Sequence, residues 1–154
     1  MSWNTAIFYR IMEGYLITIL TTVLMFWCSQ AKVYERCELA RDLVQKYQFN
    51  QCDIGNWICL IEHTSSYNTS AKRGPYPDGS HDYGIFQINS DWCGSSESTN
   101  ECGVTCDAFI TDDLTAAAKC ALKIYSVRGY ETWTDWIFKC EGKDLNKYVQ
   151  DCNL

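Results

Sequence analysis

Cysteine is the residue type with the most evident chemistry in this sequence. The chain has ten cysteines in 154 residues, a density typical of small exported domains stabilised by disulfides. Zinc binding is the competing use, but Cys102 and Cys106 lack a second cysteine pair at matching spacing, and two histidines leave little room for an imidazole-rich centre. We therefore predict a disulfide framework and no metal site.

The remaining composition excludes several classes of function. Lys plus Arg total 13 against 19 for Asp plus Glu, so the formal net charge is -6 and no basic surface is predicted for nucleic acid or anionic lipid. The sequence has no glycine-rich phosphate-binding loop. Its 47% hydrophobic and 21% charged residues are typical of one globular domain.

The first 31 residues are predicted to be a signal peptide. A nearly uncharged apolar segment at 15–27 follows Arg10 and precedes Ser29 and Ala31, which are small residues at the positions that signal peptidase recognises. A membrane anchor is the alternative, but this segment is shorter than the roughly 20 residues that a spanning helix needs. We expect cleavage after Ala31, export of residues 32–154, and nine remaining cysteines, one of them without a partner.

Hydrophobic periodicity predicts several helices and one small sheet. Helices are expected over residues 36–47, 55–65, 111–125 and 131–139. Thr111 is the expected N-cap of the third helix. Gly and Pro residues at 72–80 followed by β-forming residues at 83–89 predict a hairpin region. Helices flanking a small antiparallel sheet form an α+β fold.

Three segments and the positions of the cysteines point to a known family. The segments are KVYERCELA at 32–40, GNWIC at 55–59 and DGSHDYGIFQIN at 78–89. Together with all the cysteines after residue 31 except Cys52, they resemble the c-type lysozyme and α-lactalbumin family, glycoside hydrolase family 22. The match covers residues 32–154, and it implies a helical lobe, a small antiparallel sheet lobe and four disulfides.

The resemblance also implies how the cysteines pair. The expected disulfides are Cys37 with Cys152, Cys59 with Cys140, Cys93 with Cys106, and Cys102 with Cys120. Cys52 is left unpaired. In the chain-entropy model, closing the longest of these loops restricts the unfolded chain by roughly 4 to 5 kcal/mol.

The chemistry of this family is retaining glycoside hydrolysis, which requires one protonated and one ionised carboxyl group about 5 Å apart. By resemblance, Asp82 falls on the position of the ionised carboxylate. The acid position lies five residues after Cys59, where the family's enzymes carry glutamate and this chain has Thr64. A threonine hydroxyl cannot protonate a leaving group near neutral pH, and losing a general acid typically removes ~10²- to 10⁴-fold of the rate.

Neighbouring residues are not expected to replace the missing acid. Successive residues in a helix are rotated by about 100°, so Glu62 lies roughly 200° around the helix from Thr64. His63 is displaced by about 100° from the same position. Efficient catalysis is therefore not expected.

The binding half of the site is better matched than the catalytic half. By resemblance, the substrate-binding residues are Gln87, Asn89, Trp92 and Trp133. Flat aromatic rings and amide groups suit sugar faces and N-acetyl groups. We interpret Trp57 and Trp136 as core residues.

α-Lactalbumins also have threonine at the acid position, and their calcium loop discriminates between the two branches of the family. The corresponding positions here are Ala108, Thr111, Asp113, Ala116 and Ala117. They offer too few oxygen ligands for calcium. The sequence therefore implies no metal, no cofactor and no galactosyltransferase partner.

Three functions follow as hypotheses. The first is a secreted, monomeric lysozyme-like protein that binds N-acetylglucosamine oligomers or peptidoglycan in a cleft, with weak or no muramidase activity. The second is an active lysozyme with an antibacterial or digestive role, using Asp82 and another acid. The third is protein recognition on the same scaffold without enzymatic activity. None of the three involves nucleic acid, or a membrane after signal cleavage.

Overall fold

The computed structural model describes residues 31–94 and 100–154. The chain divides into residues 1–30 and the compact unit Ala31–Leu154, and only the second unit is described below. The predicted signal peptide therefore lies outside the described residues, apart from Ala31. Within the described residues, no helix has the length and apolar character to cross a membrane.

Among the described residues of the unit, four α-helices and five short 3-10 helices hold about half of the chain. The α-helices are α2 (Arg36–Gln45), α3 (Ile54–Ser65), α4 (Thr115–Arg128) and α5 (Thr134–Lys139). The 3-10 helices are η1 (Gln51–Asp53), η2 (Ser90–Trp92), η3 (Cys106–Phe109), η4 (Tyr130–Thr132) and η5 (Asn146–Tyr148). The structure thus confirms a helical unit with a small sheet, the predicted α+β class.

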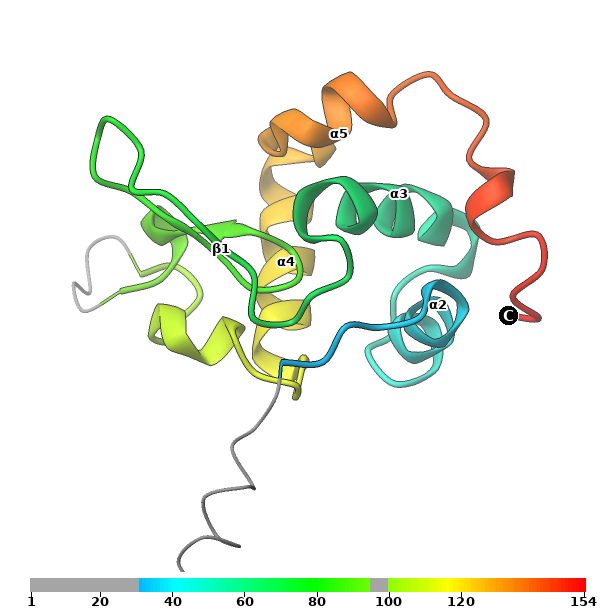
Figure 1. Ribbon diagram of the computed structural model, residues 1–154, viewed down its shortest axis with the longest axis horizontal. Coiled ribbons are helices and arrows are strands. Elements are labelled where there is room, and N and C mark those ends of the chain that lie inside the picture. The colour runs from blue at the N-terminus through cyan, green and yellow to red at the C-terminus, as the bar shows by residue number, and fades with distance from the viewer. Residues whose placement is uncertain (1–30, 95–99) are drawn as a thin grey trace, which may run out of the picture. The chain divides into compact units, whose positions relative to one another are not determined.

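Helix α3 is the central element of the helical lobe. It packs against α2 and α5, and Figure 1 shows it between them. Its buried residues are Ile54, Trp57, Ile58, Cys59, Leu60, Ile61, Thr64 and Ser65. A helix that is apolar on most sides must be surrounded by other elements. The helix ends at Ser65, and the left-handed backbone of the C-cap residue Ser66 (φ 52°) turns the chain toward the sheet.

The sheet has three short antiparallel strands in the order β1 (Lys72–Arg73), β2 (Asp82–Tyr83) and β3 (Ile88–Asn89). Arg73 pairs with Asp82, and Asp82 pairs with Asn89. Asp82 therefore lies on the central strand, between these two side chains.

The segment 83–89 is less regular than its β-forming sequence predicts. Only its two ends are strands, because the chain turns between Gly84 and Gln87. Gly84 has φ 73°, and a Cβ atom at this position would lie 1.9 Å from the carbonyl oxygen of Phe109. Only glycine fits this turn, which brings β3 back alongside β2.

The predicted start of the third helix is wrong. α4 begins at Thr115, four residues after the expected N-cap Thr111, whose hydroxyl donates to the carbonyl oxygen of Asp113 instead. The Asp113 carboxylate accepts from the backbone N and the hydroxyl of Thr115. Asp112 is engaged by Lys32 and Thr69, so these carboxylates organise the loop before the helix.

The four disulfides have the expected pairing. They join Cys37 to Cys152, Cys59 to Cys140, Cys93 to Cys106, and Cys102 to Cys120. Among the described cysteines, Cys52 is free, and it is exposed. The first disulfide closes a separation of 115 residues and ties α2 to the C-terminal segment.

Candidate active site

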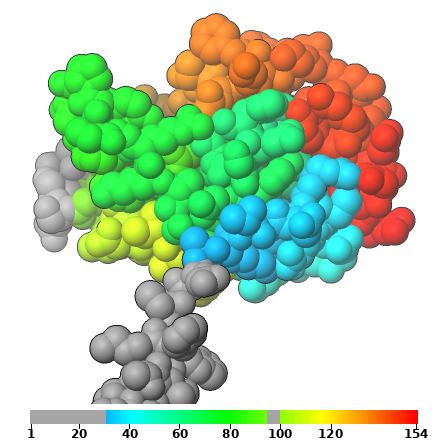
Figure 2. Space-filling model, viewed as in Figure 1, coloured from blue at the N-terminus to red at the C-terminus, as the bar shows by residue number. Residues whose placement is uncertain are grey.

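A cleft with a volume of about 530 Å³ lies between the sheet and the helical lobe. Figure 2 shows the surface hollowed between the green segment that contains β1 and the orange helix α5. All the residues expected at the site from the sequence line this cleft. They are Thr64, Asp82, Gln87, Asn89, Trp92 and Trp133.

Both oxygens of the Asp82 carboxylate are held by neighbouring donors. The hydroxyl of Tyr76 donates to Oδ2 at 2.6 Å, and Nδ2 of Asn89 donates to Oδ1 at 2.9 Å. Burial, followed by the hydrogen bond to Asp82, raises the pKa of Tyr76 to about 12. Tyr76 therefore stays protonated at neutral pH and serves as a permanent donor to the carboxylate.

Thr64 lies in the last turn of α3, with only 4% of its surface exposed. Its hydroxyl oxygen has no hydrogen-bond partner among the described residues. The next residue, Ser65, bonds back to the carbonyl oxygen of Ile61 at 3.1 Å, as helical hydroxyls commonly do. Because Thr64 lines the cleft, its hydroxyl is available to a bound ligand.

Gln87 lines the cleft and also stabilises the turn between β2 and β3. Its Nε2 donates to the carbonyl oxygens of Ala71 and Gly84, at 3.0 and 2.8 Å. These bonds hold the turn between β2 and β3. The amide oxygen Oε1 is buried without a partner among the described residues.

The two expected tryptophans form walls that are mostly covered. Trp133 is 5% exposed and its indole N–H donates to the carbonyl oxygen of Phe86 at 2.9 Å. Trp92 is 8% exposed, and the guanidinium of Arg128 lies 5.2 Å from its ring centroid. Only a small part of each indole ring therefore borders the cleft.

Glu62 and His63 do not line the cleft. His63 Nε2 lies 3.3 Å from the hydroxyl of Tyr148, on the side of α3 that meets η5. The charge of Glu62 contributes to the raised pKa values of Tyr67 and Tyr148, which places it near the same region. Neither side chain occupies the position of a general acid opposite Asp82.

Two charged residues that the sequence did not indicate as site residues line the cleft and contact each other. Arg73 in β1 forms an ion pair with Asp135 in α5, with 2.8 Å between Nη1 and Oδ2. Arg73 also donates to the backbone carbonyl oxygen of His63 at 3.1 Å. These partners are 62 and 10 residues away in sequence, so no local pattern indicates the contact.

Tyr76 was also missed. It lies between Pro75 and Pro77 in a loop that the sequence indicates only as a turn. The one available signal is its distance of six residues from Asp82 across that turn, which lets the two side chains meet.

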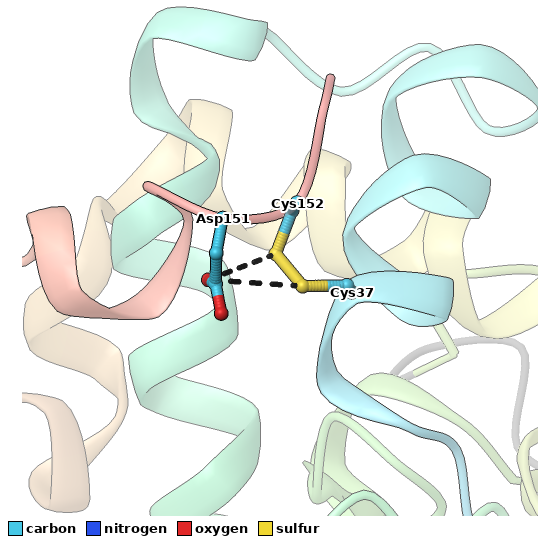
Figure 3. Close-up of side chains that lie close together, drawn as sticks. All are labelled: Cys37, Asp151 and Cys152. Carbon is cyan, nitrogen blue, oxygen red and sulfur yellow. Dashed lines mark hydrogen bonds between the residues drawn. A yellow bond between two sulfur atoms is a disulfide. The ribbon is translucent and has the colours of Figure 1, made fainter.

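One group of described side chains has metal-ligand atoms close together, but its chemistry does not suit a metal. It consists of Cys37, Asp151 and Cys152 (Figure 3). The two sulfurs are bonded to each other, and the Asp151 carboxylate forms an ion pair with Arg36 at 2.7 Å. A disulfide sulfur is not a thiolate, so only one ligand would remain.

The helical lobe, the three-stranded sheet, the cleft between them and the four disulfides define a lysozyme-type fold. Residues 32–152 match the sequence profile of the C-type lysozyme/alpha-lactalbumin family.

Curated relatives show the same relationship over most of their length. Lysozyme C-1 of Mus musculus is 41% identical over 133 residues, covering 82% of this chain and 90% of that protein. Lysozyme C, tracheal isozyme, of Bos taurus is 40% identical over 144 residues, covering 90% and 98%. Lysozyme C of Penaeus merguiensis is 41% identical over 133 residues, covering 80% and 84%. This chain therefore belongs to the C-type lysozyme/alpha-lactalbumin family.

Proposed function

We propose that this protein is a secreted lysozyme-like protein that binds N-acetylated oligosaccharides and has weak or no muramidase activity. The observation that carries the proposal is the pairing of Asp82 with Thr64 in one cleft. A carboxylate is present on the sheet side, and a hydroxyl stands where retaining hydrolysis needs a protonated carboxyl group.

Two other groups of the cleft, Tyr76 and Asp135, do not replace the missing acid. Tyr76 touches Asp82, but a phenol with a pKa of about 12 is a poor donor to a leaving group near neutral pH. Asp135 is held in its ion pair with Arg73, with 2.8 Å between Nη1 and Oδ2, so its carboxylate is engaged by that residue. The surroundings of Asp82 thus favour binding over bond cleavage.

Sugar binding is supported by the remaining groups of the cleft. Asn89, Asp82 and Tyr76 provide polar atoms on the sheet side. The indole ring of Trp92 lines the cleft from η2, directly after β3, and that of Trp133 lines it from the helical lobe. Polar groups facing apolar ring edges are typical of carbohydrate sites. The names of the curated relatives, all lysozymes, point to N-acetylated polysaccharides as the ligand class.

Secretion is supported by the disulfides. Four disulfides in one small domain require an oxidising compartment, and the apolar segment before Ala31 supplies a route there.

The decisive experiment compares cell-wall clearing by the wild type and by Thr64→Glu, after binding of N-acetylglucosamine oligomers has been measured by calorimetry. We expect binding by both proteins, little clearing by the wild type and a gain of clearing by Thr64→Glu. Thr64→Gln is the matched control, because it has a similar volume to glutamate but no acidic proton. Robust release of reducing ends by the wild type would contradict the proposal.

An active glycosidase is the second candidate, and the retained carboxylate favours it. Asp82 is held by Tyr76 and Asn89 in a defined orientation, as a catalytic carboxylate would be. Turnover of chitin oligomers by the wild type, abolished by Asp82→Asn, would support this candidate over the binding protein.

A further inference from the structure

Arg73 joins the two walls of the cleft. Its guanidinium, on strand β1 of the sheet wall, forms the ion pair with Asp135 on helix α5 and also donates to the carbonyl oxygen of His63 at the end of α3. Both charged residues line the cleft. A contact between side chains on opposite walls crosses the space between them, so we call the Arg73 and Asp135 ion pair the cleft bridge.

The cleft bridge lies beside Thr64. The carbonyl that accepts from Arg73 belongs to the peptide bond between His63 and Thr64, so the guanidinium is within one peptide unit of the acid position. In retaining hydrolysis, the acid protonates the leaving-group oxygen, and the leaving-group sugar therefore sits next to the acid. The cleft bridge occupies the side of the cleft that this sugar would need.

We propose that the cleft bridge narrows the leaving-group side and that Arg73 thereby determines which oligosaccharides the protein prefers. The proposal rests on the proposed function, because it concerns ligands of the same cleft. The leaving group of a glycoside is attached at the anomeric carbon. A chain that is hindered from extending past Thr64 therefore binds mainly with its reducing terminus there, and the protein recognises short oligosaccharides by that end.

The open side of the cleft selects against anionic ligands. Arg73 and Asp135 neutralise each other, and the other charged residues among the described residues that line the cleft carry a net negative charge. These residues are Asp78, Asp82, Asp91 and Arg128. Three carboxylates against one guanidinium repel carboxylate-bearing peptidoglycan fragments and tolerate uncharged N-acetylglucosamine oligomers.

Removing the cleft bridge is expected to leave the fold intact. The side chains of Arg73 and Asp135 are 44% and 33% exposed, and exposed ion pairs contribute little to stability. Lys72 provides the matched control. It is the neighbouring residue of β1 and is also exposed, but it lies over the ring of Tyr83 and does not line the cleft.

The test measures the affinity of N-acetylglucosamine oligomers of increasing length for the wild type, Arg73→Ala, Asp135→Ala and Lys72→Ala by calorimetry. The wild type and Lys72→Ala should stop gaining affinity at the length that fills the open side. The affinity of Arg73→Ala and Asp135→Ala should rise about tenfold more when the oligomer is lengthened by the next sugar. One well-made additional contact contributes about this much. Retained unfolding temperatures would show that each variant is folded.

The outcomes separate the cleft bridge from the proposed function. The same length dependence in wild type and Arg73→Ala would overturn the cleft bridge while leaving oligosaccharide binding intact. Binding by Arg73→Ala but not by the wild type would support the cleft bridge and contradict the proposed function. Absence of binding by every variant would overturn both.

Discussion

Arg73 and Asp82 are direct partners in the ladder between β1 and β2, so their side chains stand on the same face of the sheet. The guanidinium therefore reaches across the floor of the cleft from beside Asp82 to the end of α3 at His63. Arg73 is thus paired in the sheet with the residue that carries the retained carboxylate, and its charge lies near the position of the missing acid. The position of the Arg73 guanidinium therefore affects the pKa of an acid restored at position 64.

Restoring the acid should work better when Arg73 is also removed. A nearby positive charge lowers the pKa of a carboxyl group, and a general acid must be protonated at the working pH. We expect Thr64→Glu to clear cell walls only in the more acidic range, and Thr64→Glu combined with Arg73→Ala to extend clearing to higher pH. The measurement is the pH profile of clearing for both proteins.

The control for this pH shift combines Thr64→Glu with Lys72→Ala, which removes a charge of the same sign from the same strand. Its profile should match that of Thr64→Glu. Identical profiles for all three proteins would show that the Arg73 guanidinium does not act on position 64.

The phenol of Tyr76 should titrate as a partner of Asp82. Its pKa is raised from 10.0 to about 12, first by burial and then by the hydrogen bond to Asp82. Asp82→Asn removes the carboxylate but not the burial, so the pKa of Tyr76 should fall yet stay above 10.0. Absorbance titration of tyrosinate measures this, and Tyr76→Phe identifies the transition. An unchanged transition in Asp82→Asn would contradict the pairing.

The raised pKa of Tyr76 also determines the direction in which the free energy of unfolding changes at alkaline pH. A folded-state pKa above the unfolded value means that the contribution of Tyr76 is complete below about pH 10 and is lost as the pH rises toward 12. Tyr76→Phe should therefore lose less stability over this range than the wild type.

The sequence predicted those parts of the molecule that depend on local spacing. Apolar residues at helical intervals placed α2 and α3 within a residue or two, because each helix must bury one face in the core. The start of α4 was missed because Thr111, a good cap by type, bonds to the loop carbonyl of Asp113. The Thr111 hydroxyl can either cap the helix or bond within the loop, and the path of the folded chain determines which of the two occurs.

The sequence predicted only those site residues that belong to the family motif. Thr64, Asp82 and Asn89 follow from the resemblance, and the structure brings them to one cleft. Arg73, Tyr76 and Asp135 did not follow, because their partners come from other elements and their residue types are ordinary on a surface. The role of such residues at the site can be recognised only once the structure shows which partners they contact.

Gly84 should tolerate no side chain. A Cβ atom there would lie 1.9 Å from the Phe109 carbonyl oxygen at φ 73°, so the backbone would have to move. We expect Gly84→Ala to destabilise the protein by about 3 kcal/mol or more, measured by denaturant unfolding. Gly79 is the matched control. It also has positive φ (83°) but no atom within 4 Å, and Gly79→Ala should cost only about 1 kcal/mol. Equal losses would show that backbone strain, not the clash, governs both.

Cleavage after Ala31 should add an ion pair to the folded protein. The backbone nitrogen of Lys32 lies 3.0 Å from Oδ1 of Asp112, and the hydroxyl of Thr69 donates to the same oxygen at 2.7 Å. When Lys32 becomes the first residue, this nitrogen carries a positive charge, and the hydrogen bond becomes charge-assisted on both sides. The mature protein should therefore unfold at a higher temperature than a form with extra residues before Lys32.

The pH dependence of this difference in unfolding temperature should identify Asp112 as the residue that causes it. The hydrogen bond from Thr69, followed by that from the Lys32 backbone, holds the pKa of Asp112 below its ordinary 3.8. A depressed folded-state pKa means that the stabilisation is present above about pH 4 and is lost as the pH falls through the folded value. It is also lost at alkaline pH, where the α-amino group of Lys32 gives up its proton. Asp112→Asn should make the mature and extended forms equally stable at every pH. A difference that persists in Asp112→Asn would mean that the new N-terminus is stabilised by other contacts.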